Sequence, residues 1–168
     1  MKNKLAELLY LENLVKKKIS EDERKRMRGR IFAQMICSLA KNLVRDAGYK
    51  VATTIIKREI RKVGRNDANH LMELLGLKEK TVENASRILK VAAMILGLRL
   101  DAVGSETIIR ECPQGMEAIK LNEPLMCNVC LEYCNGIIES VVGIDYKIER
   151  TKCIVNGDEY CMFRIVKR

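Results

Sequence analysis

The chain has 168 residues, of which 48% are hydrophobic and 32% are charged, and its formal net charge is +9. This length and composition predict one domain with a hydrophobic core, to which an extra helix is appended. The most apolar central run, from Val91 to Leu98, is far too short to cross a bilayer, so we expect no membrane span.

The basic residues are concentrated in the first part of the chain. Residues 1–65 contain 18 Lys and Arg against 7 Asp and Glu, a net charge of +11. Residues 66–168 contain 13 against 15, a net charge of −2. A basic tract of this kind is usually a solvated helix face, and contact with nucleic acid or another anionic partner is the alternative.

Apolar residues at helical spacing predict helices over nearly all of the first hundred residues. The first, residues 4–19, carries more apolar surface than a free terminus needs, so we treat residues 1–19 as a candidate dimerisation element. Ser20 and Glu23 fit a capping box that opens a second, longer helix, and Gly48 is placed to end it. Further helices are expected over residues 51–63, 66–75 and 81–96.

After residue 97 the pattern changes to short strands. Two strands are expected over residues 98–103 and 107–112, followed by an irregular stretch, residues 116–125, with room for one more short strand. A late helix is predicted over residues 125–142, and a C-terminal hairpin turns at Asn156-Gly157. The order predicts an α+β domain over residues 20–168, with N-terminal helices packed on one side of a mostly antiparallel sheet.

Six of the seven cysteines follow residue 111, and four of them form two spaced pairs. Cys127 and Cys130 lie one turn apart near the start of the late helix, while Cys153 and Cys161 flank the hairpin turn. Four thiolates from two such segments can close a tetrahedral zinc site, and Cys134 lies on the same helix face as a substitute ligand. The alternative is a set of buried, apolar cysteines.

The N-terminus lacks the apolar core and cleavage site of a signal peptide, so we expect a cytoplasmic protein with reduced thiols. The single histidine, His70, is far from the cysteines in sequence, which removes most Ser-His and Cys-His catalytic schemes. No glycine-rich phosphate loop is present. These features favour a binding domain over an enzyme, with a thiol-dependent enzyme using Cys112 or Cys134 as an alternative.

The C-terminal part also contains a recognisable motif, Cys153-x3-Gly157-x3-Cys161-x-Phe163, preceded by Cys127 and Asn135-Gly136. With these residues the chain resembles the 4-vinyl reductase domain family of small-molecule (hydrocarbon-binding) domains. That family includes the aromatic-sensing domains of phenol-responsive activators, and it shares a fold with TRAPP trafficking subunits and haem nitric-oxide sensors. The resemblance is sharpest over residues 105–166.

The resemblance implies a zinc site made by a Cys before the helix, a Glu on the strand and the two Cys of the closing motif. Cys127, Cys153 and Cys161 match the three cysteines, but Arg150 stands where the Glu is expected. Glu149 is one residue away and would point to the opposite face of the sheet. We therefore assign Cys130 as the fourth ligand, with Glu149 or Cys134 in reserve and a metal-free member as the other alternative.

The resemblance also implies a ligand pocket between the helices and the sheet. The candidate lining residues are apolar: Ile36, Leu39, Leu43, Met94 and Ile109. The resulting hypothesis is a homodimeric binding domain for a small apolar or aromatic molecule, with a structural zinc site and a sensory or regulatory role. An oxidoreductase related to tetrapyrrole vinyl reduction and a basic, nucleic-acid-associated regulator are the alternatives.

Overall fold

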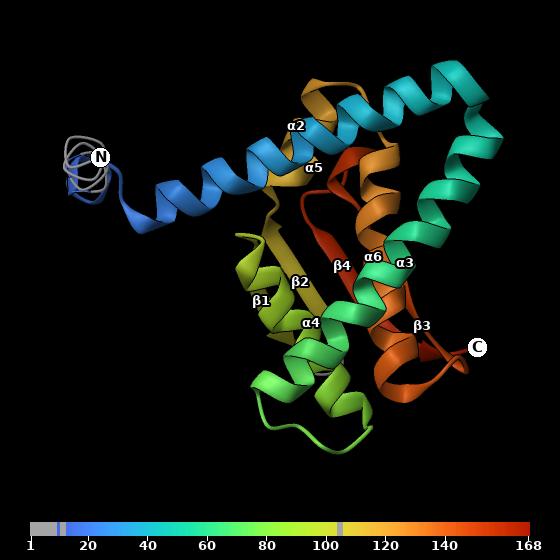
Figure 1. Ribbon diagram of the computed structural model, residues 1–168. Helices are drawn as coiled ribbons and strands as arrows, with labels where there is room; N and C mark the ends of the chain where they lie inside the picture. The colour runs from blue at the N-terminus through green and yellow to red at the C-terminus, as the bar shows by residue number, and fades with distance from the viewer. Residues whose placement is uncertain (1–9, 11–12, 104–105) are drawn as a thin grey trace, which may run out of the picture.

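A computed structural model describes residue 10 and residues 13–103 and 106–168 of the chain (Figure 1). Besides a helical segment at residues 13–18, the described ranges contain five helices numbered α2 to α6, one short 3₁₀ helix (η1) and four strands. In chain order they are α2 (Glu21–Ala47), α3 (Tyr49–Leu74), α4 (Val82–Ile95), β1 (Arg99–Val103), β2 (Glu106–Glu111), α5 (Pro113–Lys120), α6 (Leu125–Val142), β3 (Tyr146–Lys152), η1 (Ile154–Asn156) and β4 (Cys161–Lys167).

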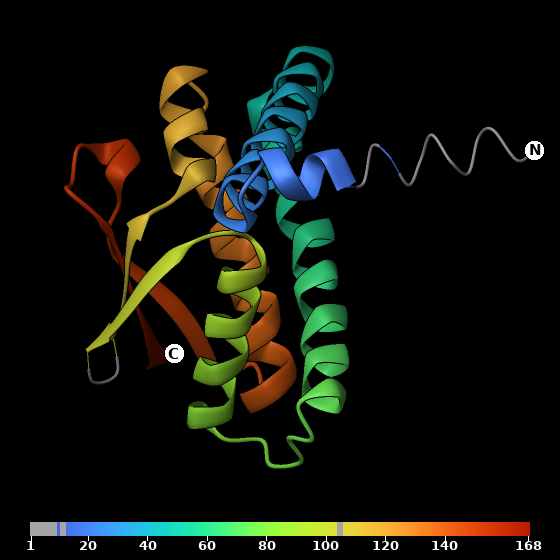
Figure 2. The ribbon, with the colours of Figure 1, turned by 90° about the vertical axis from the view of Figure 1, so that its left-hand side faces the viewer.

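The four strands form one antiparallel sheet in the order β1-β2-β4-β3. The helices lie on one side of this sheet, and α6 lies between the strands and α3 (Figure 2). The main core fills the space between α4, α6 and the sheet. The predicted α+β class, with helices on one side of an antiparallel sheet, is confirmed.

The inward face of α2 is built from small residues. Ser20 caps the helix as predicted, because its hydroxyl accepts a hydrogen bond from the backbone N–H of Glu23 at 3.1 Å. The buried positions are Gly29, Ala33, Cys37 and Ala40. Small side chains let α2 approach its neighbours closely, whereas several of its large apolar side chains, including Ile31, Met35 and Leu39, are exposed.

Two predicted boundaries are wrong. The segments 51–63 and 66–75 form one continuous helix, α3, with no break before Asn66, where the second segment was expected to begin. Residues 116–120, part of the stretch 116–125 that was expected to be irregular, belong to helix α5, which begins at Pro113. Pro113 at the first helical position has a backbone angle suited to a helix start, and the Cys112 sulfur accepts the Gly115 N–H at 3.2 Å.

Helix α6 is the central element and has the bounds that the sequence predicts. By length and composition it is apolar enough to cross a membrane, but nine of its residues are buried inside the domain, as expected of a core helix. Its backbone passes unusually close to the backbone of α3. A Cβ added at Gly64 would lie 2.2 Å from the Tyr133 carbonyl oxygen, and one at Gly136 would lie 2.3 Å from the Arg61 carbonyl oxygen. Only glycine fits at either position.

The predicted N-terminal helix falls largely outside the described residues. Residues 13–18 are helical, and nothing in the structure bears on the proposed dimerisation through residues 1–19. Dimer formation therefore stays a prediction.

Candidate functional site

A cavity of about 400 Å³ lies between α6 and the sheet, with walls also formed by α2, α3, α4 and the first turn of α5. Its lining is mostly apolar: the side chains include Phe32, Ile60, Val63, Leu89, Ala92, Leu96, Leu100, Met126, Val129, Ile148 and Phe163. This volume lies within the range of small-molecule sites in proteins. The cavity is the strongest candidate for a functional site in the described part of the chain.

The strands supply alternate residues to the cavity, as a pleated sheet requires. Ile148 and Arg150 on β3 line it, whereas Glu149 between them lies on the other face of the sheet and accepts a hydrogen bond from Arg164 at 2.7 Å. Glu149 is therefore directed away from the cysteines, as the sequence predicts for this register. It does not supply a ligand to a site between the helices and the sheet.

Only two of the five predicted lining residues border the cavity. Ile36 and Ile109 border the cavity, but Leu39, Leu43 and Met94 do not. Leu39 and Met94 are exposed to 63% and 54%. The assignment failed at these positions because it assumed that the largest side chains of each helix face inward. On α4 the small residues Ala92 and Ala93 face the cavity instead.

Five thiols border this one cavity: Cys112, Cys127, Cys130, Cys134 and Cys161. Burial raises the pKa of all five thiols, to about 12 for Cys134 and Cys161. The nearby Cys153 raises the pKa of Cys127 and Cys161 further. The thiols are therefore neutral at pH 7 and act as soft, nearly apolar wall groups rather than as activated nucleophiles.

The structure brings only three of the four predicted zinc ligands close together. Cys127, Cys153 and Cys161 lie near one another, because the end of β3 and the start of β4 meet the first turn of α6. In the described ranges, however, no group of three or more His, Cys, Asp or Glu side chains has a geometry suited to a metal ion. As it stands, the arrangement does not fit a closed four-coordinate site.

Arg150 occupies the position where the resemblance implies an acidic ligand. Its guanidinium donates a hydrogen bond to the Cys127 carbonyl oxygen at 3.1 Å and lies 3.5 Å from Asn128 Oδ1. A positive charge at this point opposes cation binding, and it ties β3 to the start of α6 without a metal. Zinc binding by Cys127, Cys130, Cys153 and Cys161 accordingly remains a prediction that a metal assay tests.

The cavity has one polar pair in its helical wall. Tyr133 on α6 donates its phenolic O–H to Asp67 Oδ2 on α3 at 2.8 Å, and both residues border the cavity. Burial, followed by the hydrogen bond to Asp67, raises the pKa of Tyr133. Neither residue was predicted from the sequence. The one available signal was an acid on the apolar face of a predicted helix, one turn after Val63.

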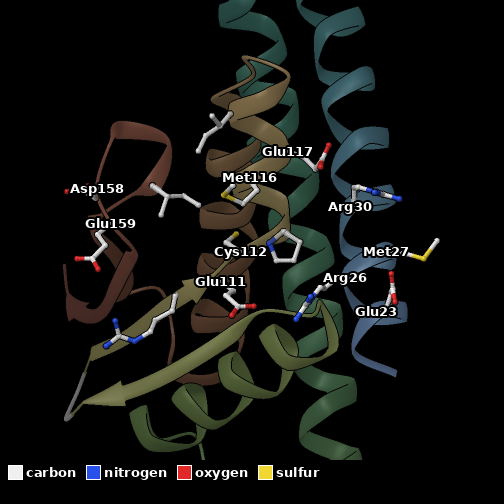
Figure 3. A pocket seen from close by; sticks show the side chains of 14 residues that line it. Glu23, Arg26, Met27, Arg30, Glu111, Cys112, Met116, Glu117, Asp158 and Glu159 are labelled. Carbon is white, nitrogen blue, oxygen red and sulfur yellow. The ribbon is translucent and has the colours of Figure 1, made fainter. Parts of the chain in front are cut away.

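A second, larger hollow of about 780 Å³ lies outside the cavity, between α2, α5 and the η1–β4 connection. Figure 3 shows Arg26 and Arg30 on α2 across this hollow from Asp158 and Glu159. Several of its charged residues are paired within the chain: Arg110 with Asp101, Glu111 with Arg99, and Glu117 with Lys120. Because these charged groups already have partners within the chain, fewer of them are available to bind a ligand. The hollow is therefore a weaker candidate for a ligand site than the apolar cavity.

No family model matches the sequence, and neither does any curated protein. Several solved structures match the fold, among them the following two. The phenol-responsive sensory domain of the transcription activator PoxR, with phenol, aligns with a TM-score of 0.63 and 15% identity, over 80% of this chain and 74% of that one. A trafficking protein particle complex subunit 3 from Naegleria fowleri, covalently bound to palmitic acid, aligns with a TM-score of 0.63 and 19% identity, over 84% and 96%.

The chain shares its fold with both structures. These are two of the groups that the sequence resemblance links by fold, so that part of the expectation is confirmed. At identities below 20% the likeness shows the fold alone, and membership of the 4-vinyl reductase family itself is not shown.

Proposed function

We propose that this protein binds one small apolar molecule in the cavity between α6 and the sheet, and that this binding serves a sensory or regulatory role. The observation that carries the proposal is the cavity itself, which is about 400 Å³ in volume and is lined mainly by apolar side chains and neutral thiols. Sites for small molecules are concave and mainly apolar, with a few polar groups that orient the ligand.

The two similar structures support this proposal. One is titled as a phenol-responsive sensory domain and the other as covalently bound to palmitic acid, so both hold a largely apolar molecule. The raised pKa values of the cavity thiols disfavour the alternative of a thiol-dependent enzyme, since the reactive form of a cysteine is the thiolate.

The proposal is tested by placing a fluorophore in the cavity wall. The chain contains no tryptophan, so Phe163→Trp introduces a single indole at a buried position that borders the cavity. The matched control is Tyr49→Trp, at an exposed residue outside the cavity. We expect 1-methoxyoctane to change the emission of the Phe163→Trp protein saturably and to leave that of the Tyr49→Trp protein unchanged.

Binding should also raise the melting temperature of the unmodified protein, because a ligand that binds only the folded state stabilises it by mass action. A linear, non-saturating response that is the same in both tryptophan variants, with no shift in melting temperature, would refute the proposal.

A further inference from the structure

The polar pair in the cavity wall is held in place by the close crossing of α3 and α6. Asp67 lies one turn after Gly64, and the backbone at Gly64 packs directly on the Tyr133 carbonyl. This contact fixes the separation of the two helices next to the pair. The Tyr133 hydroxyl and Asp67 Oδ2 then meet at 2.8 Å across the interface.

Tyr133 donates a hydrogen bond to only one of the two carboxylate oxygens of Asp67, Oδ2. In the described part of the chain no other group donates a hydrogen bond to Asp67, and no Lys or Arg forms an ion pair with it. Asp67 is also the one acidic side chain among the described residues that line the cavity. A carboxylate beside an apolar space is costly unless its oxygens accept hydrogen bonds, so Oδ1 is suited to a donor from a ligand.

Other polar side chains of the cavity are already engaged with the protein. Gln114 donates to the Leu96 carbonyl oxygen at 3.0 Å and accepts from the Cys112 thiol at 3.7 Å. Arg150 donates to the Cys127 carbonyl oxygen. Thr107, which also borders the cavity, has a neutral hydroxyl, so Asp67 is the described lining residue that offers a ligand a charged acceptor.

The spacing along α6 indicates the shape of that ligand. Tyr133 lies six residues after Cys127, a rise of about 9 Å along the helix. Apolar residues and neutral thiols fill the wall between these positions. The cavity therefore offers an acceptor beside Tyr133 and an apolar wall that extends towards the thiols.

We infer that Asp67 selects apolar molecules that carry one terminal hydrogen-bond donor, a hydroxyl or an ammonium group, and that Tyr133 positions its carboxylate. This inference rests on the proposed function and names the ligand class of the same cavity. The donor group binds Asp67 Oδ1, while the hydrocarbon part lies against α6 and the sheet.

The test uses two isomers that differ only in the donor. 1-Nonanol and 1-methoxyoctane have the same atoms, but only the alcohol can donate a hydrogen bond. With the Phe163→Trp reporter we expect the alcohol to bind at least about tenfold more tightly than the ether, the factor typical of a hydrogen bond to a charged acceptor. Nonylamine provides the cationic donor, and whichever donor binds more tightly identifies the kind of donor group that the site prefers.

Two variants assign the preference to Asp67. In Tyr133→Phe the close crossing of α3 and α6 still places the carboxylate in the wall, but the hydrogen bond that orients it is lost, so the preference for the alcohol should be weaker and should persist. In the double variant Asp67→Leu with Tyr133→Phe both partners become apolar, which limits the loss of stability, and the preference should disappear while the ether still binds.

Equal affinity for the two isomers in the reporter protein, or a preference that survives the double variant, would overturn the inference and leave the proposed function intact. Loss of the preference in Tyr133→Phe alone would also overturn it, because the phenol would then be the recognising group. If neither isomer binds at all, the proposed function itself fails.

Discussion

The two ends of the cavity use polar groups in opposite ways. At the start of α6, Arg150 donates to a main-chain carbonyl, and the surrounding thiols are neutral, so none of the described side chains at this end offers a ligand a negatively charged acceptor. Near the middle of α6, Asp67 is held by a single donor, Tyr133, and retains an accepting oxygen. The difference indicates that the thiol end provides an apolar surface for the hydrocarbon part of a ligand. The Asp67 end determines which ligands bind, because it can accept a hydrogen bond from them.

The largest expected effect comes from the helix crossing that supports the Asp67 end. Gly64→Ala places a methyl group against the Tyr133 carbonyl oxygen, and we expect it to lower the free energy of unfolding by about 3 kcal/mol or more in urea titrations. The control is Gly157→Ala, where a Cβ meets no atom within 4 Å and the cost is that of a left-handed backbone conformation, about 1–2 kcal/mol. Equal losses in the two variants would contradict the proposed close packing.

A smaller effect is expected at the thiol end. Arg150→Leu removes the hydrogen bond to the Cys127 carbonyl and should lower the free energy of unfolding by about 1–3 kcal/mol, while Arg150→Lys should retain part of it. If the two variants are equally stable, the guanidinium does not act as the link between β3 and α6.

Metal analysis tests whether Arg150 prevents zinc from binding at the thiol end of the cavity. Purified protein should be assayed for zinc before and after chelation, alongside Arg150→Glu, which restores the acidic residue that the resemblance implies. Since a guanidinium opposes cation binding at this position, we expect Arg150→Glu to retain more zinc per chain than the unmodified protein. One zinc per unmodified chain, unaffected by this substitution, would show that the four-cysteine prediction is right and that Arg150 does not exclude the metal.

A pH titration tests the neutral state of the thiols. A folded-state pKa of about 12 for Cys134 lies above the ordinary value of about 8.5, so the folded state holds this proton more tightly than the unfolded chain. Its contribution to stability is complete below about pH 8.5 and is lost as the pH rises towards 12. We expect Cys134→Ala to show a weaker decrease in unfolding free energy between pH 8 and 10 than the unmodified protein; identical pH slopes would refute this account.

The smallest effect is expected on the outer face of the sheet. Glu149→Gln breaks an exposed ion pair with Arg164 and should change the unfolding free energy by less than about 1 kcal/mol, with no change in ligand affinity. A marked loss of affinity would place Glu149 in the site, contrary to its position on the opposite face.

The elements that the sequence predicted well are those with strong local signals. Ser20 caps its helix as expected, and α6 has its predicted bounds, because caps and apolar periodicity are local properties. Helix α3 was divided near Asn66 because tertiary packing overrides this weak local signal. Helix α5 was missed because Pro113 was interpreted as the end of the preceding strand, although it also suits the first position of a helix.

The cavity was harder to predict, since its wall depends on which face of each helix meets the sheet. Leu39 and Met94 were assigned to it by size, yet small residues hold the inward positions. The Asp67–Tyr133 pair joins residues 66 positions apart, so no local pattern reveals it. The closeness of Cys127, Cys153 and Cys161, by contrast, followed from the hairpin and the helix start.

The central claim, that the cavity binds one apolar molecule, is tested most directly by native mass spectrometry of the protein isolated from its own cells. The comparison variant is Val129→Trp, in which an indole replaces a buried side chain of the cavity wall and fills the space. We expect one organic molecule bound per chain in the unmodified protein and none in the Val129→Trp variant. A bare chain in both samples, or the same bound mass in both, would contradict the claim.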